Sequence, residues 1–337
     1  MVLGSGEIVS VNAQSKYKNL YKAMKGASNN FGIVTKFYMS TFEQGDFWGG
    51  ANYHAWEPTA DAHTDAFVKF TDNVANDPFG SVLHIRAYDQ RQSTPGMKAS
   101  LIANAMHYTK SLPDKTAPPV APAAFKDFLA IQGEIAPLNT IRNSNLSDFT
   151  RELELGNRRG GRALFSTLTF ANDLETMKQV DAEGLKLRAK YENVPGLQWY
   201  QIYQPLPASF TKLSAERGGN VLGLDRVKGN SIIFLFYLVW DRVEDDKALY
   251  AVTEEYLSAV NRITGQQKSK RDFIYLNYAF PTQDPIGSYG DANVQFLKET
   301  SKTFDPNQVF QNLVPGGFKL SKVAKRAPKD KDGKDKP

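Results

Sequence analysis

The 337-residue sequence contains no cysteine, which excludes disulfides, thiolate metal sites, cysteine nucleophiles and any cofactor bond through sulfur. It also lacks long apolar runs. No stretch approaches the roughly 20 residues that a helix needs to span a bilayer, so we expect no membrane partner. The first residues carry neither a basic leader nor an apolar signal core. These absences leave the cellular localisation and the oligomeric state open.

Histidine is scarce as well, and its four copies do not form a metal-site pattern. His54, His63, His84 and His107 include no close pair and no i, i+4 pair flanked by a carboxylate. We interpret them as isolated packing or surface residues and predict no metal site. The sequence also has no Walker-type loop, no Gly-x-Gly-x-x-Gly fingerprint and no nucleophile elbow. A P-loop enzyme, a Rossmann domain and a serine hydrolase are therefore poor interpretations.

Charge is nearly balanced along most of the chain. The 41 basic residues exceed the 36 acidic ones by five, and much of the excess lies in residues 322–336. This stretch has almost no apolar content and no aromatic residue that could stack on a base. We therefore predict a disordered basic tail over residues 321–337 and no nucleic-acid partner.

Segments with strand-like and helix-like patterns follow one another through the chain. Several of the strands alternate apolar and polar residues, as strands do in a sheet that is covered on one face. The predicted fold class is α+β, with a largely antiparallel sheet covered by helices. The predicted helices span residues 17–25, 61–74, 123–131, 146–155, 173–191, 243–264 and 293–303. The predicted strands span residues 7–11, 31–42, 81–88, 100–108, 163–170, 197–204, 232–240 and 273–279.

Two separated segments carry a family resemblance. The first runs from Asn19 through Gly26 and Asn29-Asn30-Phe31-Gly32 to Phe37. The second comprises Tyr275-Leu276-Asn277-Tyr278, Ser288-Tyr289-Gly290, Asn293 and Asp305-Pro306-Asn307-Gln308-Val309-Phe310. Together, and in this order around a predicted α+β domain, they resemble the berberine bridge enzyme-like FAD-linked oxidases, relatives of vanillyl-alcohol oxidase and p-cresol methylhydroxylase.

The resemblance implies a division of the chain. Residues 1–45 would be the C-terminal remnant of a PCMH-type FAD-binding domain, and residues 46–265 the α+β substrate domain. Residues 266–320 would return to the flavin domain before the tail. The family's N-terminal flavin subdomain has no counterpart in this sequence, so we expect a truncated member that retains FAD weakly or not at all.

The resemblance also implies a set of FAD contacts. Its glycines would keep side chains away from the dinucleotide, and its strand amides would bond the adenosine end. A side-chain amide can both donate and accept at a polar flavin edge, and a phenol offers a hydroxyl. The predicted FAD-binding residues are Gly26, Asn30, Gly32, Ile33, Val34, Asn277 and Tyr278.

Tyr275 is the predicted catalytic residue, because a tyrosine at the matching position of the family lies at the reactive face and helps to take the substrate's hydroxyl proton. An isolated phenol loses its proton only near about pH 10, so a neighbouring group must share the proton or stabilise the anion. Gln201 and Tyr203 lie on one face of the strand before Pro205, and they are the candidate substrate-binding residues.

The function implied by the resemblance is that of an FAD-dependent oxidase with a small-molecule substrate and oxygen as its partners. Hydride would pass from an alcohol, a sugar or a secondary-metabolite intermediate to flavin, and the flavin would be reoxidised by oxygen. The truncation leaves the activity of this chain open. The alternative is a cofactor-free binding or scaffold protein built on the α+β domain, which would bind a ligand without flavin absorbance.

Overall fold

The chain forms two compact units in the computed structural model, which describes residues 1–93, 99–112, 118–155 and 158–324. Unit 1 comprises residues 1–39, 212–226 and 272–337, and unit 2 comprises residues 40–211 and 227–271. Residues 212–226 were predicted within the middle domain, but they pack with the two end segments of the chain. Most of the predicted tail lies outside the described residues.

Unit 2 is built on one eight-stranded sheet with the order β4-β1-β3-β2-β6-β7-β5-β8, and all of its strand pairs are antiparallel. The strands are β1 (Phe47–Ala55), β2 (Gly80–Asp89), β3 (Ser100–Tyr108), β4 (Arg142–Ser144), β5 (Arg162–Ala171), β6 (Gln198–Leu206), β7 (Ser231–Trp240) and β8 (Lys270–Arg271). The helices of this unit are α2 (Trp56–Asn73), α3 (Lys126–Leu129), α4 (Leu146–Leu155), α5 (Leu174–Arg188) and α7 (Asp246–Gln266). This arrangement confirms the predicted α+β class.

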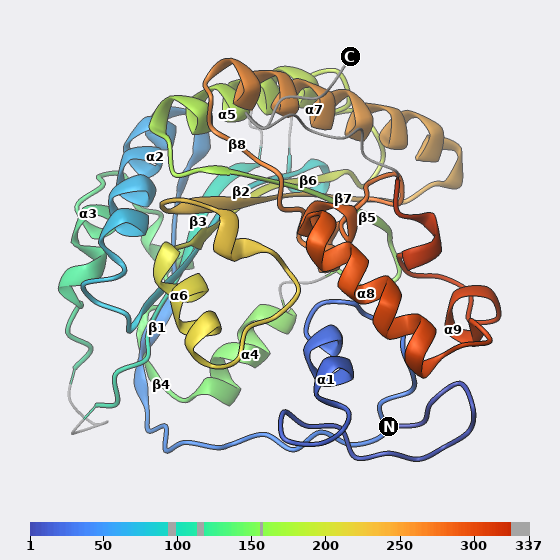
Figure 1. The fold of residues 1–337 in the computed structure, drawn as a ribbon. Coiled ribbons are helices and arrows are strands. Elements are labelled where there is room, and N and C mark those ends of the chain that lie inside the picture. The colour runs from blue at the N-terminus through green and yellow to red at the C-terminus, as the bar shows by residue number, and fades with distance from the viewer. Residues whose placement is uncertain (94–98, 113–117, 156–157, 325–337) are drawn as a thin grey trace. The chain divides into compact units, whose positions relative to one another are not determined.

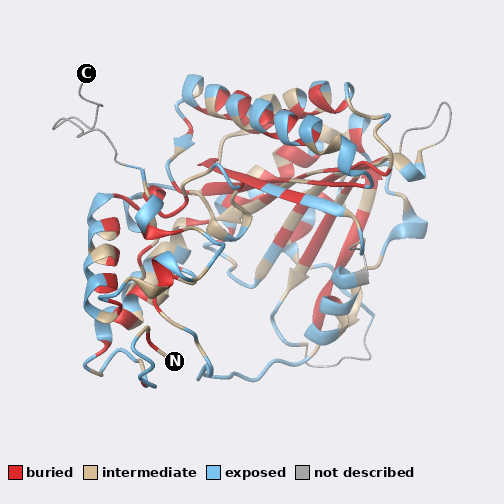
Figure 2. Cartoon of the chain, turned by 90° about the vertical axis from the view of Figure 1, so that its right-hand side faces the viewer, coloured by how far each residue is buried: buried red, intermediate tan, exposed pale blue. Residues whose placement is uncertain are grey.

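Helices cover one face of this sheet. Figure 1 shows α2, α5 and α7 lying over the same side of the strands. The apolar sequence of β7 explains its central position, because nearly all of its side chains are buried. On β6 burial alternates: Trp199, Gln201 and Tyr203 are buried, whereas Tyr200 and Ile202 are half-buried. In Figure 2 the buried residues of the long helices lie on the side that faces the sheet.

Aromatic side chains form much of the core beneath these helices. The rings of Trp199 and Phe236 lie 4.6 Å apart, and Tyr256 of α7 contacts both of them. The first turn of α5 is fixed by Asp173, whose carboxylate accepts a hydrogen bond of 2.8 Å from the Thr176 amide. These aromatic rings of β6, β7 and α7 therefore form core packing.

Unit 1 contains three helices in its described part. They are α1 (Lys18–Met24), α8 (Asp291–Phe304) and α9 (Val309–Asn312), and α6 (Ala208–Glu216) ends in this unit. The rings of Tyr17 and Phe304 lie 5.7 Å apart where α1 meets α8. Asp305 accepts hydrogen bonds of 2.9 and 2.8 Å from the Val309 and Phe310 amides, so its carboxylate fixes the start of α9.

Three predicted strands of unit 1 are wrong. Residues 7–11 and 31–42 form only isolated bridges, in which Val2 pairs with Ile8 and with Ile33. Residues 273–279 contain a 3₁₀ turn, Leu276–Tyr278, in place of a strand. A strand needs a neighbouring strand that forms hydrogen bonds with its backbone amides and carbonyls. The apolar pattern of residues 31–42 predicts a strand but does not provide such a neighbour. Phe37, Tyr38 and Phe42 are accordingly exposed.

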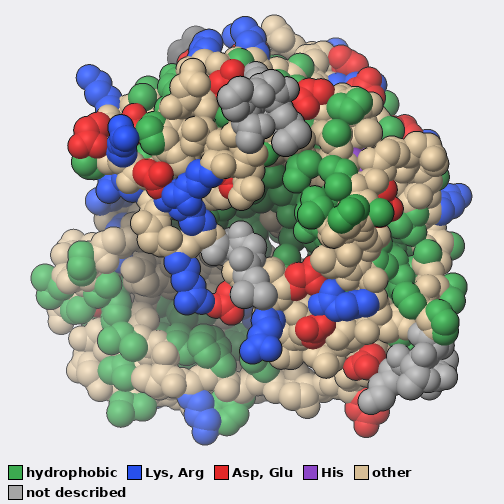
Figure 3. Space-filling view, turned by 180° about the vertical axis from the view of Figure 1, so that it is seen from behind, with side chains coloured by type: hydrophobic (Ala, Val, Ile, Leu, Met, Phe, Trp, Pro, Cys, Tyr) green, Lys and Arg blue, Asp and Glu red, His purple; other side chains and the backbone are tan. Residues whose placement is uncertain are grey.

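Acidic and basic side chains are interspersed on one side of the molecule. On the side seen in Figure 3, Lys and Arg lie among Asp and Glu and form no continuous basic patch. Within the described part of the chain, no helix combines the length and the apolar character that a membrane crossing requires.

Candidate functional site

A pocket of about 500 Å³ lies within unit 1 and is built from three segments that are far apart in the sequence. The segments are the turn after α1, the stretch after α6, and the C-terminal segment that begins at Tyr275. The lining residues are Lys25, Gly26, Ser28, Ser214, Arg217, Gly219, Asn220, Leu222, Tyr275, Leu276, Asn277 and Tyr289.

Gly26 shapes the first wall. Its backbone adopts φ = 141°, which favours glycine. An added methyl group would lie 2.7 Å from Leu222 Cδ2 and 2.9 Å from Val221 Cγ2. The Gly26 carbonyl accepts a hydrogen bond of 2.8 Å from the Tyr289 hydroxyl. Only glycine fits this close approach of three segments.

Asn220 organises the second wall. Its amide nitrogen donates to Ser214 Oγ at 2.7 Å, and its carbonyl oxygen accepts from the Leu222 amide at 2.9 Å. Gly218 and Gly219, which precede it, have φ values of 87° and 68°. Left-handed glycines allow the chain to reverse directly after α6. The reversal brings the stretch back to α1, where the Gly219 carbonyl accepts a hydrogen bond from Lys25 Nζ at 3.2 Å.

The third wall carries Tyr275 and Asn277. The Asn277 amide donates a hydrogen bond of 2.9 Å to the Tyr275 phenolic oxygen. The fully buried ring of Tyr289 stacks against Phe273 at 6.5 Å, and burial raises the pKa of Tyr289. Tyr289 therefore donates its hydroxyl hydrogen bond to the backbone as a neutral phenol. Tyr275, by contrast, accepts a side-chain hydrogen bond from Asn277 on its phenolic oxygen.

The pocket gathers three of the residues that the sequence singled out, namely Gly26, Tyr275 and Asn277. Tyr278 is not in the lining, although its ring lies edge-on to Tyr275 with centroids 4.8 Å apart. Local sequence patterns alone could not join three segments that begin at Lys25, Ser214 and Tyr275.

Asn30, Gly32, Ile33 and Val34 lie away from the pocket lining. Asn30 is fully buried, donates to the carbonyls of Ala27 and Phe318, and accepts from Gln311 Nε2. It holds the turn after α1 to the C-terminal segment. The Ile33 amide, predicted to bond the adenosine end of FAD, donates to the Val2 carbonyl at 2.9 Å. Gly32 lies beside the same bridge, because an added methyl group would meet the Val2 carbonyl oxygen at 2.7 Å.

Gln201 and Tyr203 lie in the core of unit 2. Both are fully buried on the helix-covered face of β6, and Gln201 Oε1 accepts a hydrogen bond of 2.5 Å from the Tyr256 hydroxyl. Burial raises the pKa of Tyr203, so its phenol stays neutral. This position does not fit the wall of a substrate pocket. Tyr200 and Ile202 project from the other face of the same strand, which α2, α5 and α7 leave uncovered.

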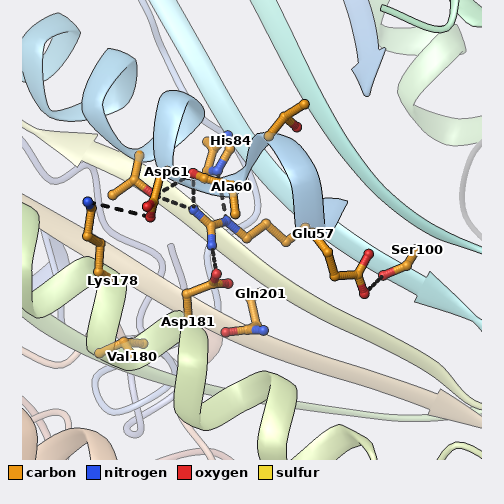
Figure 4. A network of polar contacts seen from close by, with 12 residues as sticks. Glu57, Ala60, Asp61, His84, Ser100, Lys178, Val180, Asp181 and Gln201 are labelled. Carbon is orange, nitrogen blue, oxygen red and sulfur yellow. Dashed lines mark hydrogen bonds and ion pairs between the residues drawn. The ribbon is translucent and has the colours of Figure 1, made fainter. Parts of the chain in front are cut away.

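A second polar cluster lies under the helices of unit 2, as Figure 4 shows. Arg86 of β2 is fully buried, forms an ion pair with Asp181 of α5, and donates from Nε to His84 Nε2 at 3.0 Å. His84 Nδ1 lies 2.7 Å from Asn104 Oδ1, and the Asn104 amide lies 3.2 Å from His63 Nδ1. The charge of Arg86 is thus embedded in a chain of hydrogen bonds that crosses the sheet.

Three of the four histidines belong to this cluster, so the interpretation of isolated histidines is wrong. The rings of His54 and His63 lie 4.6 Å apart, and those of His63 and His84 lie 5.7 Å apart. Burial, together with the nearby Arg86, lowers the pKa of His84 well below its ordinary value. In the described part of the chain, His, Asp and Glu side chains form no group of three that could hold a metal ion. The cluster is a buried polar network of histidine and asparagine side chains around the Arg86–Asp181 ion pair.

Sequence reasoning missed the pocket residues of the second segment and the cation at the end of α1. The signal that could have found them is the run Gly218-Gly219-Asn220, a turn placed between the predicted strands 197–204 and 232–240. Its partner in space, Lys25, directly precedes Gly26. Neither observation identifies the pocket without the tertiary contacts.

Comparison with proteins of known sequence gives several relatives that are named FAD-dependent monooxygenases. The chain is 32% identical to the FAD-dependent monooxygenase elcE of Phaeosphaeria nodorum over 336 residues, which cover 96% of this chain and 92% of that protein. It is 34% identical to the FAD-dependent monooxygenase sdcF of Emericella nidulans, covering 96% of this chain and 64% of the relative. For drtC of Aspergillus calidoustus the identity is 33%, with 96% and 59% coverage. The chain thus spans about 60% of the length of the latter two relatives. No protein-family model matches it.

Solved structures share the fold. The 6-hydroxy-D-nicotine oxidase of Arthrobacter nicotinovorans superposes with a TM-score of 0.66 at 13% identity, over 92% of this chain and 63% of that chain. The xylooligosaccharide oxidase of Myceliophthora thermophila gives a TM-score of 0.62 at 15% identity, with the same coverage. Identities this low establish the fold alone. The relatives in sequence are named for FAD, so the expected cofactor class is confirmed for the family. By its identity to elcE across nearly the whole of both proteins, the chain belongs to the family of FAD-dependent monooxygenases.

Proposed function

We propose that this chain carries the flavin-edge and substrate-contacting part of an FAD-linked oxidoreductase of the berberine bridge type. Its substrate would be a small alcohol, a sugar or a secondary-metabolite intermediate. One observation carries the proposal: Gly26, Tyr275 and Asn277, chosen from two separated segments, line the same pocket. The family membership supports the cofactor, and the pocket supports the place where it acts.

The lining fits the edge of a flavin. Gly26 contributes backbone to the lining, and its missing side chain lets Leu222 and Val221 pack close to it. Tyr275 contributes an aromatic wall, and the carbonyl oxygen of Asn277 remains an acceptor after its amide has bonded Tyr275. Asn277 and the backbone at Gly26 would therefore hold the polar edge of the ring. Bound FAD supplies a hydride acceptor that oxygen can reoxidise.

Tyr275 would handle the substrate's proton. Its phenolic oxygen accepts the Asn277 hydrogen bond of 2.9 Å, and a donor in that place stabilises negative charge on the oxygen. A substrate hydroxyl within hydrogen-bond reach would pass its proton to the Tyr275 phenolate, formed once the phenol has released its own proton to solvent. Asn277 acts on this step only through Tyr275, so it is a positioning residue in that role.

The relatives and the structural neighbours differ in the reaction class that their names give. The relatives in sequence are named monooxygenases, and the solved structures are named oxidases. An oxidase returns the electrons to oxygen as hydrogen peroxide, whereas a monooxygenase places one oxygen atom in the product. We propose the oxidase reaction. Turnover under ¹⁸O₂ tests this choice, because label in the organic product contradicts it and peroxide formed in step with product supports it.

The proposal as a whole is tested by the absorbance spectrum of the purified chain before and after incubation with FAD, read near about 450 nm, where flavins absorb. A bound-flavin spectrum in the presence of excess FAD supports it, even where desalting removes a weakly held cofactor. Tyr275→Phe should keep that spectrum and lose turnover, and the exposed Tyr38→Phe should keep both. A chain that binds small molecules but never flavin would instead be the cofactor-free binding protein.

A further inference from the structure

The pocket of unit 1 is electrostatically one-sided. Its twelve lining residues include two cations, Lys25 and Arg217, and no carboxylate. The other polar members of the lining are hydroxyl and amide side chains, which are neutral. A partly enclosed site with cations and no counter-charge attracts anions, because nothing in its wall neutralises the field.

Lys25 is held at the pocket by uncharged groups. Its ammonium donates to the Gly219 carbonyl at 3.2 Å and lies 4.5 Å from the centre of the Tyr21 ring. An ammonium has three donors, and the Gly219 carbonyl takes one. The remaining donors can meet a ligand while the first keeps the side chain in place.

Arg217 follows the last residue of α6, and its side chain is exposed at the pocket. In the part of the chain that the structure describes, no hydrogen bond or ion pair engages its guanidinium. Glu216 precedes it in the sequence but does not line the pocket. A guanidinium presents a planar fork of donors that matches a carboxylate in bidentate fashion.

The remaining walls suit a flat ring. Tyr275 and Tyr289 are both in the lining, and Gly26 and Gly219 add backbone without side chains. Ser28 lies in the same lining with φ = 53°, a left-handed conformation that is uncommon for a serine. Such a conformation costs about 1–3 kcal/mol and is concentrated at ligand-binding sites. Cations at one side and aromatic walls at another define a ligand with two distinct ends.

We infer that the pocket binds a small aromatic carboxylate, with the carboxylate at Lys25 and Arg217 and the ring against Tyr275. The inference deepens the proposed function by naming the substrate class of the same pocket. That the bound acid is the substrate rests on the proposed function, whereas its binding does not. Binding of the acid does not require flavin. The two proposals can therefore fail separately.

The test measures binding of 2-naphthoate and of its neutral isostere 2-naphthamide to the purified chain by isothermal titration calorimetry, with and without FAD. We expect the carboxylate to bind at least about tenfold more tightly than the amide, as charged hydrogen bonds allow, and to weaken as salt is raised. Lys25→Met and Arg217→Gln should each remove most of this preference. Lys25→Arg should keep it, and Lys18→Met, an exposed lysine of α1 outside the lining, should not change it.

Three outcomes would overturn the inference. The first is equal affinity for acid and amide, or no binding of either. The second is a preference that survives both charge-removing variants. The third is a loss of FAD affinity in Lys25→Met and Arg217→Gln with naphthoate binding unchanged, because the two cations would then serve the phosphates of the cofactor. Absence of FAD binding together with selective naphthoate binding would refute the proposed flavin function and leave the inference standing.

Discussion

The amide nitrogen of Asn277 donates a hydrogen bond of 2.9 Å to the phenolic oxygen of Tyr275, two residues earlier in the chain. The Tyr278 ring lies edge-on to the same phenol. All three residues belong to one short stretch whose 3₁₀ turn, Leu276–Tyr278, brings the side chains together. The local turn therefore orients the phenol toward the pocket.

The first prediction concerns this pair. Asn277→Ala removes the only described donor to the Tyr275 oxygen, so we expect turnover of the FAD-loaded protein to fall by about tenfold to a thousandfold, as when an oxyanion donor is removed. Asn277 is exposed, so the midpoint of thermal unfolding should stay unchanged. Oxygen uptake and a melting curve measure the two quantities.

Asn19→Ala provides the matched control, because Asn19 is exposed on α1 and lies outside the pocket lining. It should leave both quantities unchanged. Equal turnover in Asn277→Ala and in the unmodified chain would contradict the proton role of Tyr275.

The second prediction concerns Gly26. Gly26→Ala combines a strained φ of 141° with contacts of 2.7 and 2.9 Å to Leu222 and Val221. We expect the free energy of unfolding of unit 1 to fall by about 2–4 kcal/mol, the sum of backbone strain and overpacking. Urea unfolding followed by circular dichroism measures this change.

Gly6→Ala separates the two causes. Gly6 also has a positive φ, 85°, but an added methyl group would find nothing within 4 Å. Its cost should therefore be smaller, about 1 kcal/mol, from strain alone. If the two variants cost the same, the contacts with residues 221 and 222 do not shape the pocket as described.

The third prediction concerns the buried ion pair of unit 2. Asp181→Asn leaves the fully buried Arg86 without its counter-charge, so the free energy of unfolding should fall by about 3–5 kcal/mol. The double variant Arg86→Met, Asp181→Leu should be more stable than Asp181→Asn alone, because neither position then buries a charge. Chemical denaturation of the three proteins provides the measurement.

A surface pair gives the control for this cycle. Lys69 Nζ and Asp65 Oδ2 form an ion pair of 2.6 Å at an exposed position on α2. Lys69→Met should lower the free energy of unfolding by less than about 1 kcal/mol. A small cost for Asp181→Asn as well would mean that water reaches Arg86 in solution.

Much of unit 2 could be predicted from the sequence because its strands carry their own patterns. β3 was predicted residue for residue, and β7 within one residue, since both are apolar segments bounded by polar turns. β1 was missed because Gly49 and Gly50 interrupt its pattern. Residues 31–42 have the same apolar character as a strand, yet character alone provides no hydrogen-bonding partner.

The site was predictable only in part, for a similar reason. Tyr275, Asn277 and Gly26 lie in segments with a recognisable family pattern. The chain reversal at Gly218 and Gly219 brings Arg217 and Lys25 to the same pocket. This proximity depends on tertiary contacts that no local sequence pattern shows. For Gln201 and Tyr203 the alternation placed both side chains on one face, but a period of two does not say which face the helices cover.

The fourth prediction concerns pH. Burial, with the nearby His54 and Arg86, lowers the pKa of His63 to about 3 from its ordinary 6.5, and the pKa of His84 moves in the same direction. The unfolded chain then binds more protons than the folded chain between these values, so stability is greatest above pH 6.5 and is lost as the pH falls toward 3. The loss can reach about 1.4 kcal/mol per pH unit for each histidine.

We therefore expect the free energy of unfolding of unit 2 to fall from about pH 7.5 to about pH 5.5, a window above the range in which carboxylates titrate. His63→Gln should reduce that slope, since one of the protons taken up on unfolding is gone. Lys69→Met, which does not titrate in this window, should keep the original slope. Urea unfolding at several pH values measures the slopes of all three proteins. Parallel slopes for His63→Gln and the unmodified chain would mean that His63 is solvated rather than buried on the inner face of α2.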